Sequence, residues 1–298
     1  MTKATSHQAK GNLLGVSAIL LWSTMTSLMR LLSETYGPTG GAALMYTIAT
    51  IALSLLLGWP SMKRFPLRYL VVVGSLFVTY EIALFFALAF AQNRSQAIEV
   101  AILNHMWPCL TVALAAVMGL QRASLLLIPG MAISLSGVSW ILSGGQGLTV
   151  DSILLNATQN PLSYGLGLSC AFLWAFYCCL SKKMVHSEDG TVPFFAFASI
   201  VLWIKYAFSE ETLPEPGLAS VGLLIATAVV IALGYAAWNR ALRTGNLMML
   251  AAISYTSPVL SAFLSSLLLS TTLQLSFWQG AVMVTTGSLI CWWASRRG

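Results

Sequence analysis

The sequence predicts an all-α membrane protein with ten transmembrane helices arranged as two inverted five-helix repeats. Three observations lead to this prediction: the apolar composition, the distribution of lysine and arginine, and a residue pattern that recurs along the chain. Hydrophobic residues make up 57% of the 298 positions, and charged residues only 8%. A soluble domain carries roughly 25% charged residues because its surface must stay solvated, so this chain is suited to the hydrocarbon of a bilayer.

The apolar residues form long segments that are separated by turn residues. A helix needs about 20 such residues to cross the hydrocarbon core, and the chain has room for about ten helices of that length. The segments are continuously apolar rather than alternating, which excludes the strands of a membrane barrel. The predicted helices cover residues 12–33, 39–58, 68–91, 95–118, 124–142, 163–184, 191–208, 217–241, 247–269 and 275–293.

The basic residues indicate how these helices are oriented. If the N-terminus is cytoplasmic and ten helices alternate, only Arg30, Arg94 and Lys205 of the 15 lysines and arginines lie toward the outer side. The others fall in segments on the inner side, as the positive-inside rule requires. We therefore expect a multi-pass protein of the bacterial inner (cytoplasmic) membrane, in contact with the lipid bilayer, with both termini in the cytoplasm.

A weak repeat runs through the chain. Trp22 with Arg30 recurs as Trp174 with Lys182, about 150 positions later. Nearly the same spacing relates Pro108 to Pro258, Gly130 to Gly280, and Gly137 to Gly287. Each match alone is weak, but their common order and spacing indicate a duplication.

The duplication divides the chain into a first five-helix repeat at 1–142, an outer linker at 143–162 and a second repeat at 163–298. An odd number of helices in each copy turns the second copy upside down in the membrane. Inverted repeats are typical of secondary transporters, in which one half moves against the other around a central site.

Two carboxylates fall inside predicted helices. Glu81 lies near the middle of its helix, and Glu99 lies near the outer start of the next one. A charge at mid-membrane costs roughly 2.5–3.5 kcal/mol, so it normally faces the protein interior or a water-filled cavity. Either residue could bind a substrate amine or a proton; alternatively, each is a structural partner for a tyrosine, a histidine or a helix end.

Two proline-containing stretches predict polar groups at membrane depth. A proline has no N–H to donate, so a carbonyl one turn earlier in the helix loses its partner. We expect Pro108 and Pro258 to act as hinges or kinks. The candidate cavity residues before them are Asn104, His105 and Trp107 in the first repeat, and Ser254 and Tyr255 in the second. A lone histidine is, however, more often a packed residue than a proton relay.

Several aromatic residues lie deep in the predicted helices rather than at their ends. They are Trp22, Tyr80, Trp174, Tyr177 and Trp238. Some of these rings pack in the core, but the repeat-related Trp22 and Trp174 are expected at the interface between the halves. A cavity lined by such rings would suit an apolar or aromatic solute.

Other functional classes lack their sequence signals. There is no phosphate-binding P-loop, no nucleophile elbow and no zinc-protease motif, so we expect neither an ATPase nor a hydrolase. The basic residues are scattered, which argues against a nucleic-acid partner. The five cysteines lie in apolar segments without metal-ligand or disulfide spacing, so no metal and no cofactor is expected. No feature sets the oligomeric state, and a monomer is compatible with the sequence.

Several short strings together resemble the drug/metabolite transporter superfamily, in its branch with paired EamA-type repeats, and within it the bacterial exporters of aromatic amino acids. The strings are Leu21-Trp22-Ser23-Thr24-Met25 with Arg30, Gly37-Pro38-Thr39-Gly40-Gly41-Ala42-Ala43, Tyr80-Glu81-Ile82, Gln96-Ala97-Ile98-Glu99-Val100, Trp107-Pro108, Tyr235-Ala236-Ala237-Trp238-Asn239 and Ser276-Phe277-Trp278-Gln279-Gly280-Ala281. The resemblance extends along nearly the whole chain. It departs from the family pattern at His105, where a tyrosine is expected.

The resemblance implies a ten-helix carrier that releases phenylalanine, tyrosine and tryptophan to the outside. The aromatic candidates would then form the cavity walls, Glu81 or Glu99 would hold the substrate amine, and Asn104, Ser254 and Tyr255 would make polar contacts. An alternative is a broad-specificity efflux carrier for hydrophobic or cationic toxic compounds, which an anionic site at Glu81 would also suit. A membrane enzyme would need a reacting group in the bundle, and a sensor or scaffold would normally carry a soluble domain.

Overall fold

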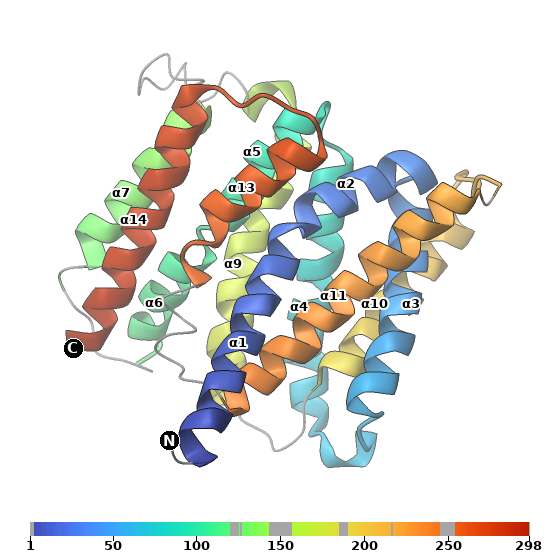
Figure 1. Ribbon diagram of the computed structural model, residues 1–298, viewed down its shortest axis with the longest axis horizontal. Helices are drawn as coiled ribbons and strands as arrows, with labels where there is room; N and C mark the ends of the chain where they lie inside the picture. The colour runs from blue at the N-terminus through green and yellow to red at the C-terminus, as the bar shows by residue number, and fades with distance from the viewer. Residues whose placement is uncertain are drawn as a thin grey trace.

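The computed structural model of the protein describes residues 3–119, 125, 127–142, 157–184, 190–215, 217–244 and 254–297, and the regular secondary structure among them is entirely helical (Figure 1). The elements are α1 (Lys3–Ser23), α2 (Met25–Tyr36), α3 (Pro38–Leu57), the short 3-10 helix η1 (Met62–Arg64), α4 (Leu67–Ala89), α5 (Arg94–Asn104), α6 (Trp107–Val117), α7 (Leu127–Leu142), α9 (Pro161–Lys183), α10 (Thr191–Ala207), α11 (Leu218–Thr244), α13 (Ser257–Leu268) and α14 (Leu275–Arg297). Most of the expected linker, residues 143–156, lies outside the described residues.

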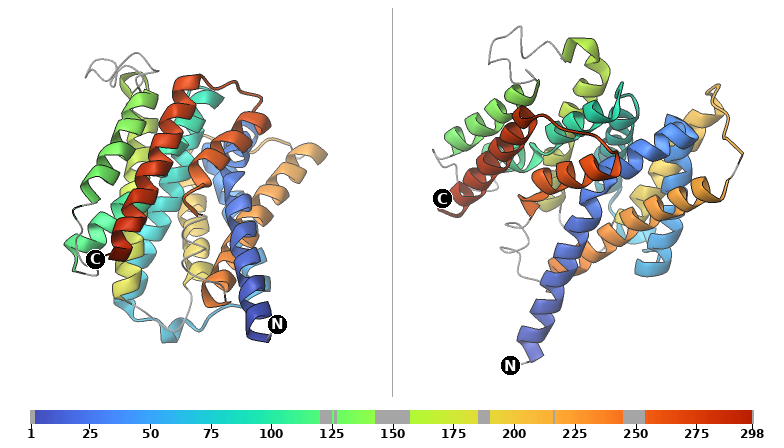
Figure 2. Two further views of the ribbon diagram at one scale, coloured as in Figure 1. Left: turned by 60° about the vertical axis from the view of Figure 1, so that its left-hand side comes forward. Right: turned by 45° about the horizontal axis from the view of Figure 1, so that its top comes forward.

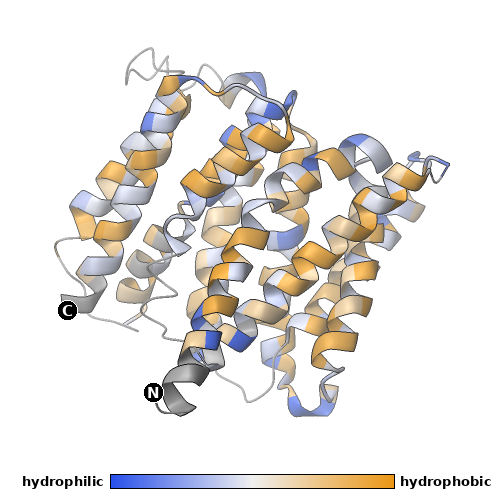
Figure 3. Ribbon diagram, viewed as in Figure 1, coloured by the Kyte–Doolittle hydropathy of each residue, from blue (hydrophilic) through white to orange (hydrophobic). Residues whose placement is uncertain are grey.

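The number of long apolar helices identifies this chain as a multi-pass membrane protein. Six helical segments are long and apolar enough to cross a bilayer: Ala9–Tyr36, Pro38–Leu57, Leu67–Ala89, Arg94–Val117, Pro161–Ser181 and Leu218–Trp238. Shorter apolar helices are Leu127–Leu142, Thr191–Ala207 and Ser257–Leu268. Hydrophobic residues predominate along the helices, whereas hydrophilic ones gather at connections such as the 3-10 helix (Figure 3).

The first predicted helix is interrupted. It was expected to be continuous over 12–33, but the structure breaks it at Thr24, between α1 and α2. Two hydroxyls accompany the break: Ser23 Oγ donates to the Ile19 carbonyl at 2.7 Å, and Thr24 Oγ1 donates to the Leu21 carbonyl at 2.7 Å. Such side-chain bonds compete with the helical ladder and bend helices.

The fourth predicted helix, over 95–118, is interrupted as well. Helix α5 ends at Asn104, and α6 begins at Trp107 with Pro108 as its second residue. Pro258 takes the same place in α13. Proline is favoured at the start of a helix because the first N–H groups have no partner there. Each proline is therefore the second residue of a helix segment.

Four helix pairs form the framework of the bundle: α1 with α11, α3 with α10, α4 with α9, and α7 with α14. Each pair joins a helix from residues 3–142 to one from residues 161–297. The last pair stands at one edge of the bundle, and both chain ends lie at the same end of it (Figure 1, Figure 2). The carboxylate of Glu211 binds the N-terminus of α3 at the opposite end, where it accepts from Thr39 N at 2.9 Å and Gly40 N at 3.0 Å.

The α7–α14 pair is close because glycines face each other across it. A Cβ atom added at Gly137 would lie 2.7 Å from the Gly280 carbonyl oxygen, and one at Gly130 would lie 2.9 Å from that of Gly287. Small residues allow backbones to approach in this way in membrane helix pairs, where burial of apolar surface does not drive association.

Candidate functional site

A cavity of about 340 Å³ lies between helices of residues 3–142 and helices of residues 161–297. Its size is within the usual range for small-molecule pockets, about 300–1,000 Å³. The lining residues come from α1, α2, α4, α5, α6, α9, α11, α13 and the turn before α13. They are Ile19, Trp22, Met25, Thr26, Met29, Tyr80, Glu81, Leu84, Leu88, Ala101, Asn104, His105, Trp107, Trp174, Cys178, Ile231, Tyr235, Trp238, Ser254, Ser257 and Ser261.

One wall of the cavity is built around Trp174 of α9. The ring centroid of Trp174 lies 4.5 Å from that of Tyr80, 4.8 Å from that of Tyr177 and 6.3 Å from that of Trp107. Offset and edge-on ring contacts of this kind hold aromatic side chains in fixed orientations. The wall therefore presents a rigid apolar surface drawn from three helices.

A second aromatic group faces it from α1 and α11. The Trp22 ring lies 5.2 Å from that of Tyr235 and 5.4 Å from that of Trp238. Gly234 makes room for Trp22, since a Cβ atom there would lie 2.6 Å from the indole Nε1. The cavity thus has aromatic surfaces on opposite helices, which suits a flat apolar group between them.

Glu81 is buried at the cavity, with 2% of its surface exposed. Tyr46 Oη donates to its Oε2 at 2.7 Å, and Tyr235 Oη donates to its Oε1. Buried charge is tolerated when hydrogen bonds satisfy it. Both carboxylate oxygens therefore have donors from α3 and α11, and the carboxylate links these helices to α4.

Asn104 and His105 lie where α5 ends. Asn104 Nδ2 donates to Tyr80 Oη at 3.3 Å, and Asn104 Oδ1 is buried without a hydrogen-bond partner. His105 Nδ1 lies 2.8 Å from the Ala101 carbonyl oxygen, and its Nε2 lies 3.4 Å from Ser257 Oγ. Buried polar atoms are nearly always satisfied, so this amide oxygen at the cavity is an exception among the described residues.

The structure brings most of the predicted site residues together. Those that line the cavity are Trp22, Tyr80, Glu81, Asn104, His105, Trp107, Trp174, Trp238 and Ser254. Three others do not line it. Tyr177 stacks on Trp174, Glu99 accepts from Tyr164 Oη at 2.6 Å, and Tyr255 packs on Trp292 with a ring separation of 6.1 Å.

Sequence reasoning missed several lining residues. Tyr235 precedes Trp238 by one helical turn and shares its face, so that spacing could have identified it. Met29, Thr26 and Ser261 carry no comparable signal, because they resemble ordinary packing residues. Their place at the cavity follows from the arrangement of α2 beside α13, where Thr26 Oγ1 lies 3.3 Å from Ser261 Oγ.

Polar contacts close one end of the cavity. Met29 and Leu88 line it, and the neighbouring Arg30 donates from Nη1 to the carbonyls of Leu88 at 2.9 Å, Ala89 at 3.0 Å and Ala91 at 2.6 Å. A cation at the C-terminus of α4 complements the helix dipole. These contacts join α2 to the end of α4.

A carboxylate extends this closure. Glu34 pairs with Arg30 Nε at 2.8 Å and with Arg94 Nη2 at 2.8 Å. Arg94 Nη1 also donates to the Leu269 carbonyl at 3.4 Å. We call Arg30, Glu34 and Arg94 the closing cluster; it ties α2 to α4, α5 and the end of α13.

Apolar helices around an aromatic-walled cavity, closed at one end by polar contacts, define a membrane carrier for small molecules. The chain belongs to the EamA-like transporter family, which it matches twice, over residues 9–143 and 162–293.

Curated relatives cover almost the whole chain. It is 42% identical over 288 residues to the aromatic amino acid exporter YddG of Salmonella typhimurium, a match that spans 97% of this chain and 98% of that protein. It is 42% identical over 291 residues to the aromatic amino acid exporter YddG of Escherichia coli, spanning 97% and 99%. For the exporter of the same name from Ancylobacter novellus the identity is 27% over 270 residues, spanning 86% and 88%. A solved crystal structure of 20% identity shares the fold, with a TM-score of 0.68 over 98% of this chain and 100% of that chain.

Proposed function

We propose that this protein exports phenylalanine, tyrosine and tryptophan across the bacterial inner membrane by alternating access through the central cavity. The observation that carries the proposal is the pair of facing aromatic surfaces, around Trp174 and around Trp22, in a chain 42% identical to aromatic amino acid exporters. A ring held between two such surfaces gains both burial and favourable ring contacts. Ten transmembrane helices in two inverted repeats form the proposed architecture.

The packing pattern supports the inverted repeat. Exchanging the two halves converts the α1–α11 pair into the α9–α4 pair, and it maps the α3–α10 and α7–α14 pairs onto themselves. In an inverted repeat, equivalent residues meet on the axis that relates the halves. Thr47 Oγ1 lies 2.7 Å from Ser199 Oγ, and this pair is 152 positions apart. The double family match has the same halves.

Asn104 is the proposed contact for the substrate ammonium group. Its Oδ1 is an acceptor without a partner at the cavity, whereas the oxygens of Glu81 are occupied by tyrosine hydroxyls. An ammonium group would displace one of these hydroxyls to reach Glu81, whereas Asn104 Oδ1 has no hydrogen bond to give up, although a small side-chain movement must first expose it. We therefore assign Glu81 mainly to holding α3, α4 and α11 together.

The closing cluster is the proposed gate at the end of the cavity away from the termini. Alternating access requires that this end opens while the other closes. Opening would separate α2 from the end of α4, and therefore break the Arg30 contacts with three carbonyls. With both termini in the cytoplasm, as proposed from the basic residues, this gate faces outward.

A broad efflux carrier for hydrophobic or cationic compounds is the second candidate. The presence of Glu81 at the cavity favours it, because a carboxylate there could attract a cation. Protection of cells against an organic dication, without protection against an aromatic amino acid analogue, would select this candidate over amino acid export.

The decisive experiment uses purified protein in liposomes loaded with radiolabelled tryptophan. We expect tryptophan efflux to exceed that from equally loaded liposomes without protein. Unlabelled phenylalanine should suppress the labelled flux, whereas lysine should not. An imposed pH gradient then tests whether protons influence the flux. Folded protein without tryptophan flux would contradict the proposal.

A further inference from the structure

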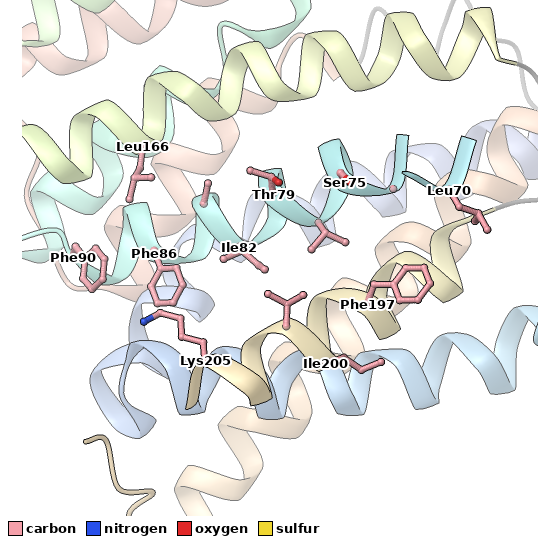
Figure 4. Close-up of a pocket in the computed structure, with 14 residues that line it drawn as sticks. Leu70, Ser75, Thr79, Ile82, Phe86, Phe90, Leu166, Phe197, Ile200 and Lys205 are labelled. Atoms are coloured by element: carbon pink, nitrogen blue, oxygen red, sulfur yellow. The ribbon is translucent and has the colours of Figure 1, made fainter. Parts of the chain in front are cut away.

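A second cavity, of about 690 Å³, lies on a lateral face of the bundle (Figure 4). It runs between α4 and α10, and Leu166 of α9 contributes to its wall. Several lining side chains are open to the surroundings: Phe197 is 38% exposed, Ile200 54% and Val201 46%. In a membrane protein such a lateral face meets lipid rather than water, so we call this cavity the lipid-facing groove.

The groove has the dimensions of one bilayer leaflet or more. Its lining residues on α4 begin at Leu70 and reach Phe90 at the helix end. Twenty residues of helix span about 30 Å, comparable to the hydrocarbon thickness. Most of the lining side chains are aliphatic or aromatic, and the hydroxyls of Ser75 and Thr79 are exceptions. An extended acyl chain crosses one leaflet, about half of that thickness, so it matches the polarity of the groove and would fill the half nearest its headgroup.

One end of the groove carries a cation. Lys205, in the last turn of α10, points toward α4 (Figure 4), and its Nζ lies 5.3 Å from the centroid of the Phe86 ring. No ion pair to Lys205 occurs within the part of the chain that the structure describes. Basic side chains near the end of a membrane helix reach toward the headgroup region, where lipid phosphates can pair with them.

We propose that the lipid-facing groove binds an anionic phospholipid, with an acyl chain between α4 and α10 and the headgroup phosphate at Lys205. The charge at one end and the long apolar floor match the two parts of such a lipid. A second copy of this chain fits less well, because a two-fold dimer through this face would bring two Lys205 side chains toward each other. The lipid would contact one helix from each half of the chain, α4 and α10.

The binding test uses purified protein in detergent with added phosphatidylglycerol or phosphatidylcholine, and native mass spectrometry to count retained lipids. We expect the wild type to retain phosphatidylglycerol in preference to phosphatidylcholine. Lys205→Gln should weaken phosphatidylglycerol retention by roughly fivefold, the equivalent of about 1 kcal/mol for one basic residue at an anionic lipid surface. Lys63→Gln, which removes an exposed lysine of η1 at the other end of α4, is the matched control.

The acyl-chain part of the site is tested separately. Thr79→Trp should fill the groove and lower retention of both lipids, whereas Leu55→Trp, at a position 83% exposed on α3, should not. Equal retention by Lys205→Gln and Lys63→Gln would overturn the proposal. It would also be overturned if Thr79→Trp converted a dimer to a monomer, since the occupant would then be a second copy. Neither measurement depends on the transported substrate, so failure here leaves the proposed export untouched.

Discussion

Glu81 shows how the surroundings of a single residue decide its role. Its position in the middle of an apolar helix is compatible with an amine site, a proton site or a structural partner. The structure gives both of its oxygens to tyrosines, Tyr46 on α3 and Tyr235 on α11. Neither tyrosine is near Glu81 in sequence. The nearby Asn104, by contrast, keeps an acceptor without a partner.

Trp174 is expected to dominate substrate affinity. Trp174→Ala should lower tryptophan affinity about tenfold, because loss of roughly 1.4 kcal/mol changes a binding constant by that factor. The matched control is Trp59→Ala, whose ring is 55% exposed and outside the cavity. Tryptophan binding to purified protein measures both. Unchanged tryptophan affinity in a folded Trp174→Ala variant would show that the substrate does not bind against the Trp174 wall.

Substitutions of Asn104 and Glu81 should affect different properties: the first tryptophan binding, the second stability. Asn104→Leu should weaken tryptophan binding, since it removes the free amide oxygen, and should change thermal stability less. Glu81→Gln should reduce the free energy of unfolding by about 1–3 kcal/mol, because one tyrosine hydroxyl loses its acceptor, and should leave binding closer to that of the wild type. Binding and thermal unfolding of the same preparations test the pair. The reverse result would make Glu81 the ammonium contact.

Interrupted helices and glycine contacts are features of whole elements. The break at Thr24 turns α2 away from α1, so that Arg30 reaches the end of α4. The break at His105 places polar groups of α5 at the cavity. By contrast, the α7–α14 pair is continuous and closely packed. In the proposed alternating access, we therefore expect the interrupted helices to be the elements that move when the cavity opens.

The closing cluster predicts a measurable change in access. Glu34→Gln should weaken the ion pairs with Arg30 and Arg94 and make a cysteine introduced by Met29→Cys react roughly threefold faster with an impermeant thiol reagent, a change typical of partly exposed ion pairs. The native cysteines are first replaced. Glu215→Gln, at the same end of the bundle but outside the cluster, is the control. Identical labelling rates for the two variants would contradict the gate assignment.

The α7–α14 contact predicts a difference between two glycines. Gly137→Ala should lower stability by about 1–3 kcal/mol, the usual cost of overpacking, because the new Cβ atom would meet the Gly280 carbonyl. Gly222→Ala in α11 meets nothing within 4 Å and should be neutral or stabilising by up to about 1 kcal/mol. Thermal unfolding in one detergent compares them. Equal melting temperatures would show that the helices separate easily.

The proposed inverted repeat is a property of the whole molecule. It pairs each framework helix with one from the other half, so that the cavity lies between the halves. Thr47 and Ser199, which would meet on the axis of the proposed repeat, are not identical, and neither are Asn104 and Ser254 at the cavity. We therefore expect the cavity to be similar in backbone but different in chemistry between the halves, which suits an asymmetric substrate.

The proposed topology predicts where reporters are active. A green fluorescent protein fused after Arg297 should fluoresce, because it folds in the cytoplasm, and alkaline phosphatase at the same point should be inactive. Alkaline phosphatase inserted in the connection between α10 and α11 should be active, since that segment is proposed to face outward. The opposite pattern of reporter activity would show that both termini lie outside and that the proposed gate faces the cytoplasm.

Sequence alone determined the properties that depend on composition and spacing. The apolar segments predicted membrane helices because hydrocarbon cannot satisfy exposed backbone groups or charges. Nine of the proposed site residues line the cavity. Seven of them are tryptophan, tyrosine, asparagine or histidine, which are unusual deep in such helices; Glu81 was found as a carboxylate in an apolar helix, and Ser254 because it precedes the second proline as Asn104 precedes the first. The helix break near Pro108 and the start of α13 near Pro258 also have a local cause, since proline favours the start of a helix.

Tertiary structure alone decided which groups meet. Glu81 and Glu99 look alike in the sequence, yet Glu81 lies at the cavity while Glu99 bonds Tyr164 outside it. The closing cluster joins Arg30 to carbonyls that lie 58 to 61 positions away, and the lipid-facing groove depends on how α4 lies against α10. These features follow from packing between distant helices. Periodicity along one helix contains no information about the helix that lies against it.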